Sequence, residues 1–276
     1  MRELLESWLA DPAHAAWLRT FLLVAARVAP MSIVAPWFAL RNAPAMVRAG
    51  VVFALSAALV ATAAPASVSA EADARTGGGL AWPLLLGSEA LLGTVFALIA
   101  SMPFFALDWA GRLTDLWRGA SAEDITAPAP GDRTSPLGAA LLLVAVAVFC
   151  ALGGHVRAFE AFAETLRAVP VGSIAWTRAA SDVGLLLARA VGGGLLLAWV
   201  VATPAAALLV LSEITFGLVG RAAPQIPLFF ASMPLRAALG LGAVLVAVPA
   251  LGGVLPRWFA GAIAEAQQLL LIFHAR

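Results

Sequence analysis

The feature that most constrains the fold of this chain is the stretch from Ala190 to Ser212, which contains no charged side chain. As a helix rising about 1.5 Å per residue, such a run is long enough to cross the roughly 30 Å hydrocarbon core of a bilayer. Comparable runs occupy Val51–Ala70, Ala90–Leu107, Leu137–Leu152, Ala238–Leu255 and Phe21–Leu40, the last interrupted only by Arg27. We therefore expect the solvent of this chain to be mostly lipid or other apolar helices.

Composition supports this expectation and fixes the fold class. Hydrophobic residues make up 62% of the chain, charged residues only 12%, and the mean hydropathy is +0.94. A water-soluble globule could not hide so much apolar surface. The 276 residues leave room for about six to eight helices with short connections. Strand alternation is absent, so we predict an all-α, polytopic hydrophobic protein in which prolines break several helices.

The same composition argues against several other classes. A net charge of +1 gives no basic stripe of the kind that binds nucleic acid. The single cysteine, Cys150, allows no intramolecular disulfide and no metal-binding cysteine pair. His14, His155 and His274 are scattered and no catalytic motif includes them. We expect no enzyme, no cofactor and no metal, and an intramembrane enzyme would need a nucleophile and a base that the sequence does not offer.

We predict one membrane-type domain over residues 1–276, because no stretch is polar enough to form a separate soluble domain. Its loops are expected near 66–79, 120–136 and 169–175, where Gly, Pro, Ser and charged residues gather. Pro30 and Pro36 should break the first apolar helix, and Pro44 should open the second. The arginines are spread over nearly every connection, so the positive-inside rule leaves the orientation open.

Charged residues within or beside the apolar runs are the first candidates for function, because an ionised group at bilayer depth persists only when it is paired, hydrated or functional. They could form a proton or ion relay in a transporter, or they could pair between helices or face water at helix ends. They do not cluster in one midplane segment. These residues are Arg27, Glu89, Asp108, Asp182, Arg189 and Glu213.

Two segments combine charges with helix breaks. Asp108, Gly111, Asp115 and Arg118 recur at spacings of three and four, which places them on one helix face, and Arg112 can reach Asp108 or Asp115 within one turn. Glu213, Gly217 and Arg221 share another helix face, which ends at Pro224-Gln225-Ile226-Pro227. Broken backbone of this kind suits a cavity or a protein interface, because lipid does not tolerate it.

These residues resemble the type III protein export apparatus family, whose members are SctT (YscT or SpaR) in injectisomes and FliR in flagella. The resemblance rests on Leu211 to Phe229 with Met233-Pro-Leu-Arg236, on Ser88-Glu-Ala-Leu-Leu-Gly93 with Asp115-Leu-Trp-Arg118-Gly119, and on Arg27-Val-Ala-Pro30. The matches follow the family order along nearly the whole chain. Pro227 and Arg236 depart from the usual asparagine and lysine. The Asp115 to Gly119 pattern is more similar to injectisome members than to flagellar ones.

The resemblance implies a non-enzymatic subunit of the export gate in the bacterial inner membrane, partly raised above the membrane plane toward the periplasm. It implies assembly with smaller hydrophobic SctR-like and SctS-like partners, with SctU-like and SctV-like subunits nearby, around a passage for unfolded proteins. The gate and assembly positions carried over from the family motifs are Arg27, Pro30, Glu89, Gly93, Asp108, Gly111, Asp115, Arg118, Gly119, Glu213, Gly217, Arg221, Pro224, Gln225, Phe229, Pro234 and Arg236.

Two alternatives stay open at this point. One is a flagellar export subunit of the FliR type. The other is a secondary transporter for a small solute or an ion, which would use the buried charges as a coupling relay. No inverted repeat is visible in the sequence, and the segments that carry charges do not mirror each other.

Overall fold

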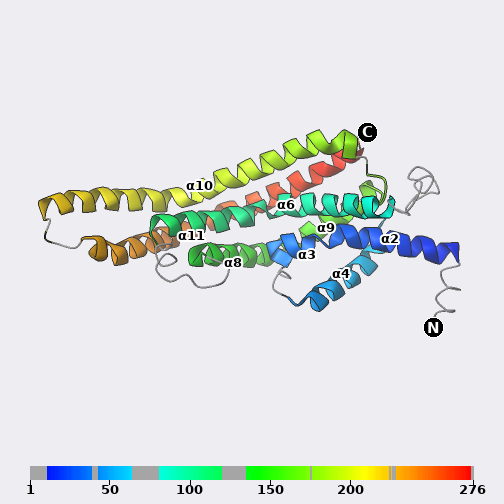
Figure 1. Cartoon of the computed structure of the whole chain (residues 1–276), viewed down its shortest axis with the longest axis horizontal. Helices are drawn as coiled ribbons and strands as arrows, with labels where there is room; N and C mark the ends of the chain where they lie inside the picture. The colour runs from blue at the N-terminus through cyan, green and yellow to red at the C-terminus, as the bar shows by residue number, and fades with distance from the viewer. Residues whose placement is uncertain are drawn as a thin grey trace. The chain divides into compact units, whose positions relative to one another are not determined.

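Every regular element in the computed structural model is helical over the residues that it describes, which are 11–38, 43–63, 81–119, 135–174, 176–223, 225 and 228–274. This confirms the all-α prediction. Figure 1 follows the helices from the N-terminus to the C-terminus by colour. They are α2 (Pro12–Val28), α3 (Met31–Val34), the 3-10 helix η1 (Pro36–Phe38), α4 (Ala45–Val60), α6 (Ala81–Trp117), α8 (Pro136–Ala151), α9 (Gly154–Ala168), α10 (Trp176–Ala222) and α11 (Leu228–His274).

Prolines and polar caps set the ends of several helices. Asp11 caps α2 by accepting a hydrogen bond from the Ala13 amide at 2.9 Å, and Pro12 follows in the first turn, where a missing N–H is harmless. α2 ends at Val28 ahead of Pro30, and Pro36 begins η1, so the predicted break of the first apolar run is confirmed. Pro103 and Pro204 lie inside the continuous helices α6 and α10.

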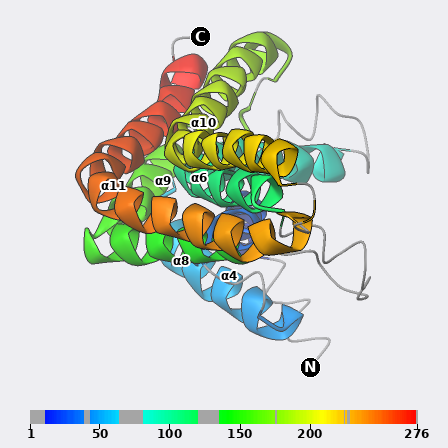
Figure 2. The same ribbon diagram turned by 90° about the vertical axis from the view of Figure 1, so that its left-hand side faces the viewer.

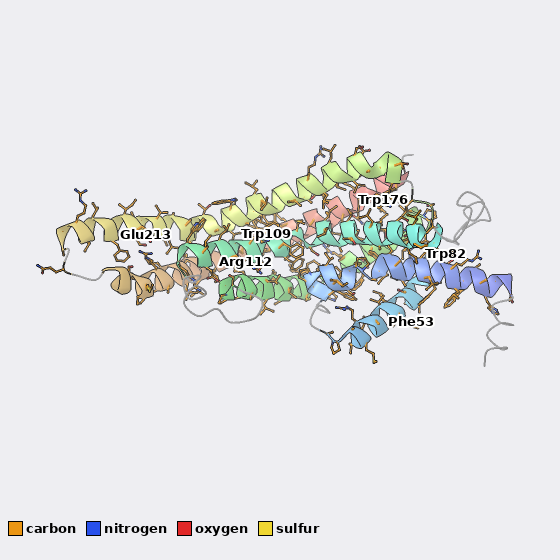
Figure 3. The ribbon with its side chains drawn as sticks, in the orientation of Figure 1. Phe53, Trp82, Trp109, Arg112, Trp176 and Glu213 are labelled. Atoms are coloured by element: carbon orange, nitrogen blue, oxygen red, sulfur yellow. The ribbon has the colours of Figure 1, made fainter. Side chains whose placement is uncertain are left out.

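The second helix, which the prolines predict to open at Pro44 and to end at Pro65, is shorter in the structure. Pro44 precedes it as predicted, but α4 ends at Val60 after 16 residues. At about 1.5 Å per residue this helix is about 24 Å long, less than the hydrocarbon core of a bilayer. α4 lies against α2, where the rings of Phe53 and Phe21 meet edge to face with centroids 4.9 Å apart (Figure 1 and, for Phe53, Figure 3).

The chain forms two compact units, and the first consists of Met1–Ser101, Gly153–Ala190 and Ala260–Arg276. Its core contains the fully buried residues Leu23, Val24, Phe96 and Phe162, and the rings of Phe96 and Phe162 lie 5.4 Å apart. α9 is amphipathic as expected: Ala158, Phe162 and Leu166 are buried while its charged residues are exposed. The connection between α9 and α10 falls in the predicted loop at 169–175.

The second unit consists of Met102–Leu152 and Val191–Phe259. Three aromatic rings form its centre, with centroid distances of 5.1 Å between Phe104 and Phe149, 4.9 Å between Phe104 and Phe259, and 5.0 Å between Phe149 and Phe259. α6 lies beside α10, where Trp117 and Trp199 are 5.7 Å apart (Figure 2). We keep the single domain over 1–276 as a prediction. The expected loop at 66–79 and residues 120–134 of the expected loop at 120–136 lie outside the described residues, and α8 begins at Pro136, the last residue of that predicted loop.

Length and composition identify three helices in the described part of the chain that could cross a membrane, at Ala13–Val34, Trp82–Trp117 and Ala179–Ala222. The number rises to 5 if each of two bent helix pairs counts as one span. The first pair is α8 with α9, and the second combines Ser232–Ala247 with Leu251–Phe273. The structure thus confirms a polytopic hydrophobic helical protein.

Candidate functional site

The structure brings two of the predicted charges together in the core of the first unit. Arg27 of α2 donates from Nε to Glu89 Oε2 of α6 at 2.6 Å, and both side chains are 0% exposed. The two residues are 62 positions apart in the chain. A buried charge without a partner is strongly unfavourable, so each ion makes the position of the other tolerable.

The pair also binds main-chain groups around the end of α9. Arg27 donates from Nη1 to the carbonyl of Thr165 at 2.9 Å and to that of Val169 at 3.0 Å. Glu89 accepts a hydrogen bond from the Gly172 amide on its second oxygen, Oε1, at 2.7 Å. Each carboxylate oxygen thereby has a donor, and the pair connects α2, α6 and the segment at the end of α9.

Gly93 explains how α2 and α6 approach closely enough to form this pair. It is buried one turn after Glu89, and a Cβ at this position would overlap the main-chain carbonyl of Arg27. The family positions Arg27, Glu89 and Gly93 therefore belong to one site.

A further contact joins the start of α10 to α6. Trp176 (Figure 3) donates from its indole nitrogen to the Ser88 carbonyl at 3.3 Å, and its ring packs on that of Phe273.

A second set of predicted residues joins α6 to α8 in the second unit. The nearly buried carboxylate of Asp115 accepts from Arg118 Nε at 2.6 Å, from Ser135 Oγ at 2.5 Å and from the Leu137 amide at 3.0 Å. Ser135 Oγ in turn accepts from the Gly138 amide at 2.9 Å and caps α8. A carboxylate is favoured here because the N-terminus of a helix carries partial positive charge.

Close backbone contact accompanies this ion pair. Gly111 of α6 lies against Gly138 of α8, and a Cβ at Gly111 would overlap the backbone of Leu137 and Gly138. Asp108 pairs with Arg112 at 2.8 Å, which is one of the two pairings that the spacing allowed for Arg112, and its side chain also borders Gly138. Figure 3 shows Arg112 near the C-terminal end of α6.

The third predicted segment forms a pair that the spacing did not reveal. Glu213 of α10 is bridged to Arg236 of α11 by two contacts, 2.7 Å to Nη1 and 3.0 Å to Nη2, and 49% of the Glu213 side chain is exposed (Figure 3). Gly217 and Arg221, on the same face of α10, are exposed. The arrangement ties the end of α10 to the beginning of α11.

The other family positions are spread over helix ends. Pro30 occupies the position before the first residue of α3, Gly119 follows α6 with a φ of 81°, and Pro234 lies in the first turns of α11. Gln225 is exposed between α10 and α11. Pro224 and the side chain of Phe229 lie outside the described part. Of the remaining predicted charges, Asp182 is half-buried and Arg189 is exposed.

Sequence reasoning missed the main-chain partners of the first site and the capping serine of the second. No sequence signal identifies the Thr165 and Val169 carbonyls or the Gly172 amide, because every residue carries such groups. Ser135 was detectable, since a serine followed by proline is a common start of a helix. No group of three or more His, Cys, Asp or Glu residues among those described could hold a metal ion.

Fold and sites together define a class of protein: an all-α polytopic protein whose apolar helices are tied together by ion pairs and glycine contacts. Residues 18–262 match the model of the family described as bacterial export proteins, family 1. The chain belongs to this family, that of the FliR and SctT subunits of type III export apparatus. The family is one of structural export subunits.

Several named relatives share sequence with this chain. It is 25% identical over 252 residues to the flagellar biosynthetic protein FliR of Bacillus subtilis, covering 91% of this chain and 95% of that protein. It is 30% identical over 156 residues to the Yop proteins translocation protein T of Yersinia pestis, covering 56% and 59%. It is also 30% identical over 169 residues to the secretion system apparatus protein SsaT of Salmonella typhimurium, covering 61% and 64%.

Proposed function

We propose that this chain is a non-enzymatic structural subunit of the type III export gate and helps to line and close a passage for unfolded proteins. Its partners are SctR-like and SctS-like hydrophobic subunits, with SctU-like and SctV-like subunits beside them. Segments 89–119 and 213–229 pack the gate in this proposal. The relatives' names include translocation and secretion apparatus proteins, which supports an export role.

The single observation that carries the proposal is the exposed apolar surface of α10. One set of large hydrophobic side chains between Leu185 and Val219 is exposed, among them Leu196 at 67% and Leu218 at 63%. As a helix, this stretch is about 50 Å long. Even at a tilt of about 40°, near the limit for transmembrane helices, it would span about 38 Å, more than the roughly 30 Å hydrocarbon core. Lipid alone does not cover such a surface, so apolar helices of partner subunits complete it.

The same mismatch supports a position partly raised above the plane of the inner membrane toward the periplasm. A helix whose apolar surface is longer than the hydrocarbon core leaves part of that surface outside the lipid. Partner helices can bury the remainder at any height relative to the membrane.

We propose an injectisome in preference to a flagellum as the site of action. The support is the Asp115-Leu-Trp-Arg118-Gly119 pattern, in which Asp115 and Arg118 pair and Gly119 adopts positive φ. Deletion of the gene is expected to stop secretion of injectisome substrates and to leave swimming motility intact. Loss of motility with intact secretion would assign the chain to the flagellar system.

Affinity purification of the full chain tests the assembly. Tagged protein solubilised in mild detergent from cells that make the whole apparatus should carry SctR-like and SctS-like subunits, identified by mass spectrometry. Failure to recover either partner would overturn the assembly proposal. Solute or ion transport by the chain reconstituted alone in liposomes would instead favour a secondary transporter.

A further inference from the structure

The buried residues Arg27 and Glu89 both also bind a segment outside α2 and α6. Arg27 reaches the carbonyls of Thr165 and Val169, and Glu89 accepts from the amide of Gly172. All three main-chain groups belong to the end of α9 and the connection that follows it. Two helices from the first third of the chain thus supply opposite charges to one short segment 165–172.

Each charge matches the main-chain group that it meets. The last carbonyls of a helix have no intrahelical donor and carry partial negative charge, which favours an arginine. The Thr165 carbonyl accepts a hydrogen bond from the Val169 amide, and Arg27 donates another to it. Gly172, with a φ of 80°, turns the backbone so that its amide meets Glu89. Removal of the pair would leave these groups without their charged partners.

We propose that the Arg27–Glu89 pair is a clasp that fixes the connection between α9 and α10 and so determines where α10 begins. In the simpler view the pair only joins α2 to α6, and the connection is held by its own packing. The clasp instead requires that the connection opens when the pair is removed, even if the helices stay together. This inference depends only on contacts within the first unit and not on an export role.

Thiol accessibility distinguishes the two views, because the chain has a single cysteine, Cys150, that can be replaced by serine. Val171 is only 2% exposed, which makes V171C a reporter for opening of the connection. The decisive variant is R27M/E89M, since replacing both ions of a buried pair with apolar groups often preserves overall stability. The assay measures maleimide labelling of the full chain in mild detergent.

We expect V171C to label about tenfold faster in R27M/E89M than in the parent, because hydrogen bonds to charged groups that hold the segment closed are lost. An exposed reporter, S173C, reports reagent access and should label rapidly in both backgrounds. The matched control is E213Q/R236M, which removes the exposed ion pair of the second unit and should leave V171C protected.

A buried reporter in the second unit separates local opening from loss of the fold. Ala145 is 0% exposed, so A145C should stay protected in R27M/E89M. If V171C labels at the parental rate in R27M/E89M, the pair does not hold the connection and the proposal is wrong. It is equally wrong if A145C and V171C accelerate together, because the pair would then support the whole fold and not this segment.

Discussion

At the scale of single residues, helices pack closely at glycines. The backbone of a neighbouring helix occupies the space that a side chain at the glycine would need. Gly93 is the sharpest case, because the Arg27 carbonyl occupies the space of its Cβ. Main chain cannot rotate away as a flexible side chain can. The close approach also keeps Arg27 within reach of Glu89, one turn before Gly93 in the same helix.

Substitution of Gly93 by alanine should therefore destabilise the protein although alanine favours helices. We expect G93A to lower the free energy of unfolding by about 1–3 kcal/mol, the usual effect of overpacking. Thermal unfolding in detergent, followed by tryptophan fluorescence, measures the change.

Gly87 provides the control for this substitution because it lies in the same helix with nothing within 4 Å of its Cβ position. G87A should be neutral or stabilising by up to about 1 kcal/mol, the difference in helix propensity. Equal effects of G87A and G93A would show that the contact with Arg27 is unimportant.

At the scale of elements, α8 is fixed by a side chain of another helix. Asp115 of α6 accepts from Ser135 and from the Leu137 amide at the beginning of α8 and is almost buried. Asp108, two turns earlier in α6, forms an ion pair with Arg112, whose side chain is half exposed. Water therefore competes with the Asp108–Arg112 pair and not with the hydrogen bonds of Asp115.

The two aspartates should therefore differ in their contribution to stability. D115A is expected to cost about 2 kcal/mol, because it leaves the Leu137 amide and Ser135 without an acceptor and Arg118 without its partner. D108A should cost less than about 1 kcal/mol, as is usual for exposed pairs. Chemical denaturation of both variants in the same detergent compares them, and a D108A effect as large as that of D115A would contradict this assignment.

At the scale of the whole molecule, the exposed apolar side chains of α10 determine what can surround the chain. Leu196 and Leu218 lie 22 positions apart on this helix, about 33 Å along its axis. That separation exceeds the hydrocarbon core, so both positions cannot lie deep in lipid unless α10 is strongly tilted. Partner helices would cover at least one of them.

Charged substitutions at Leu196 and Leu218 test whether partner helices cover these positions. L196E and L218E should each leave the chain in the membrane fraction, and at least one should reduce recovery of SctR-like and SctS-like partners about tenfold. The reason is that a partner helix would bury an unpaired carboxylate.

The control for these substitutions is E160K, on the exposed face of α9. It should leave recovery of the partners unchanged. Full recovery with both L196E and L218E would mean that partner helices do not cover this part of α10.

Much of the fold could be predicted because the relevant physics is local. Apolar runs, prolines and capping residues act over a few positions, so the helices and the break at Pro30 to Pro36 followed from the sequence. Spacing allowed Arg112 to reach Asp108 or Asp115, and the structure pairs it with Asp108. The length of α4 did not follow, because its apolar run continues past the point where the helix ends at Val60.

The candidate sites were predicted less completely. Arg27 and Glu89 stood out as charges in apolar surroundings, yet either could have paired with several other ions. Spacing places Glu213 on one helix face with Arg221, but the structure pairs Glu213 with Arg236 of α11.

The sequence by itself determined that this chain is helical, apolar and rich in charges that need partners, because hydrophobicity and helix breaks are properties of short segments. Tertiary structure alone decided which charges meet and which main-chain groups they bind, since those contacts join residues up to 142 positions apart. Which charged residues pair depends on how the helices pack. In this chain, glycines such as Gly93 and Gly111 allow that packing because the backbone of another helix lies where their side chains would be.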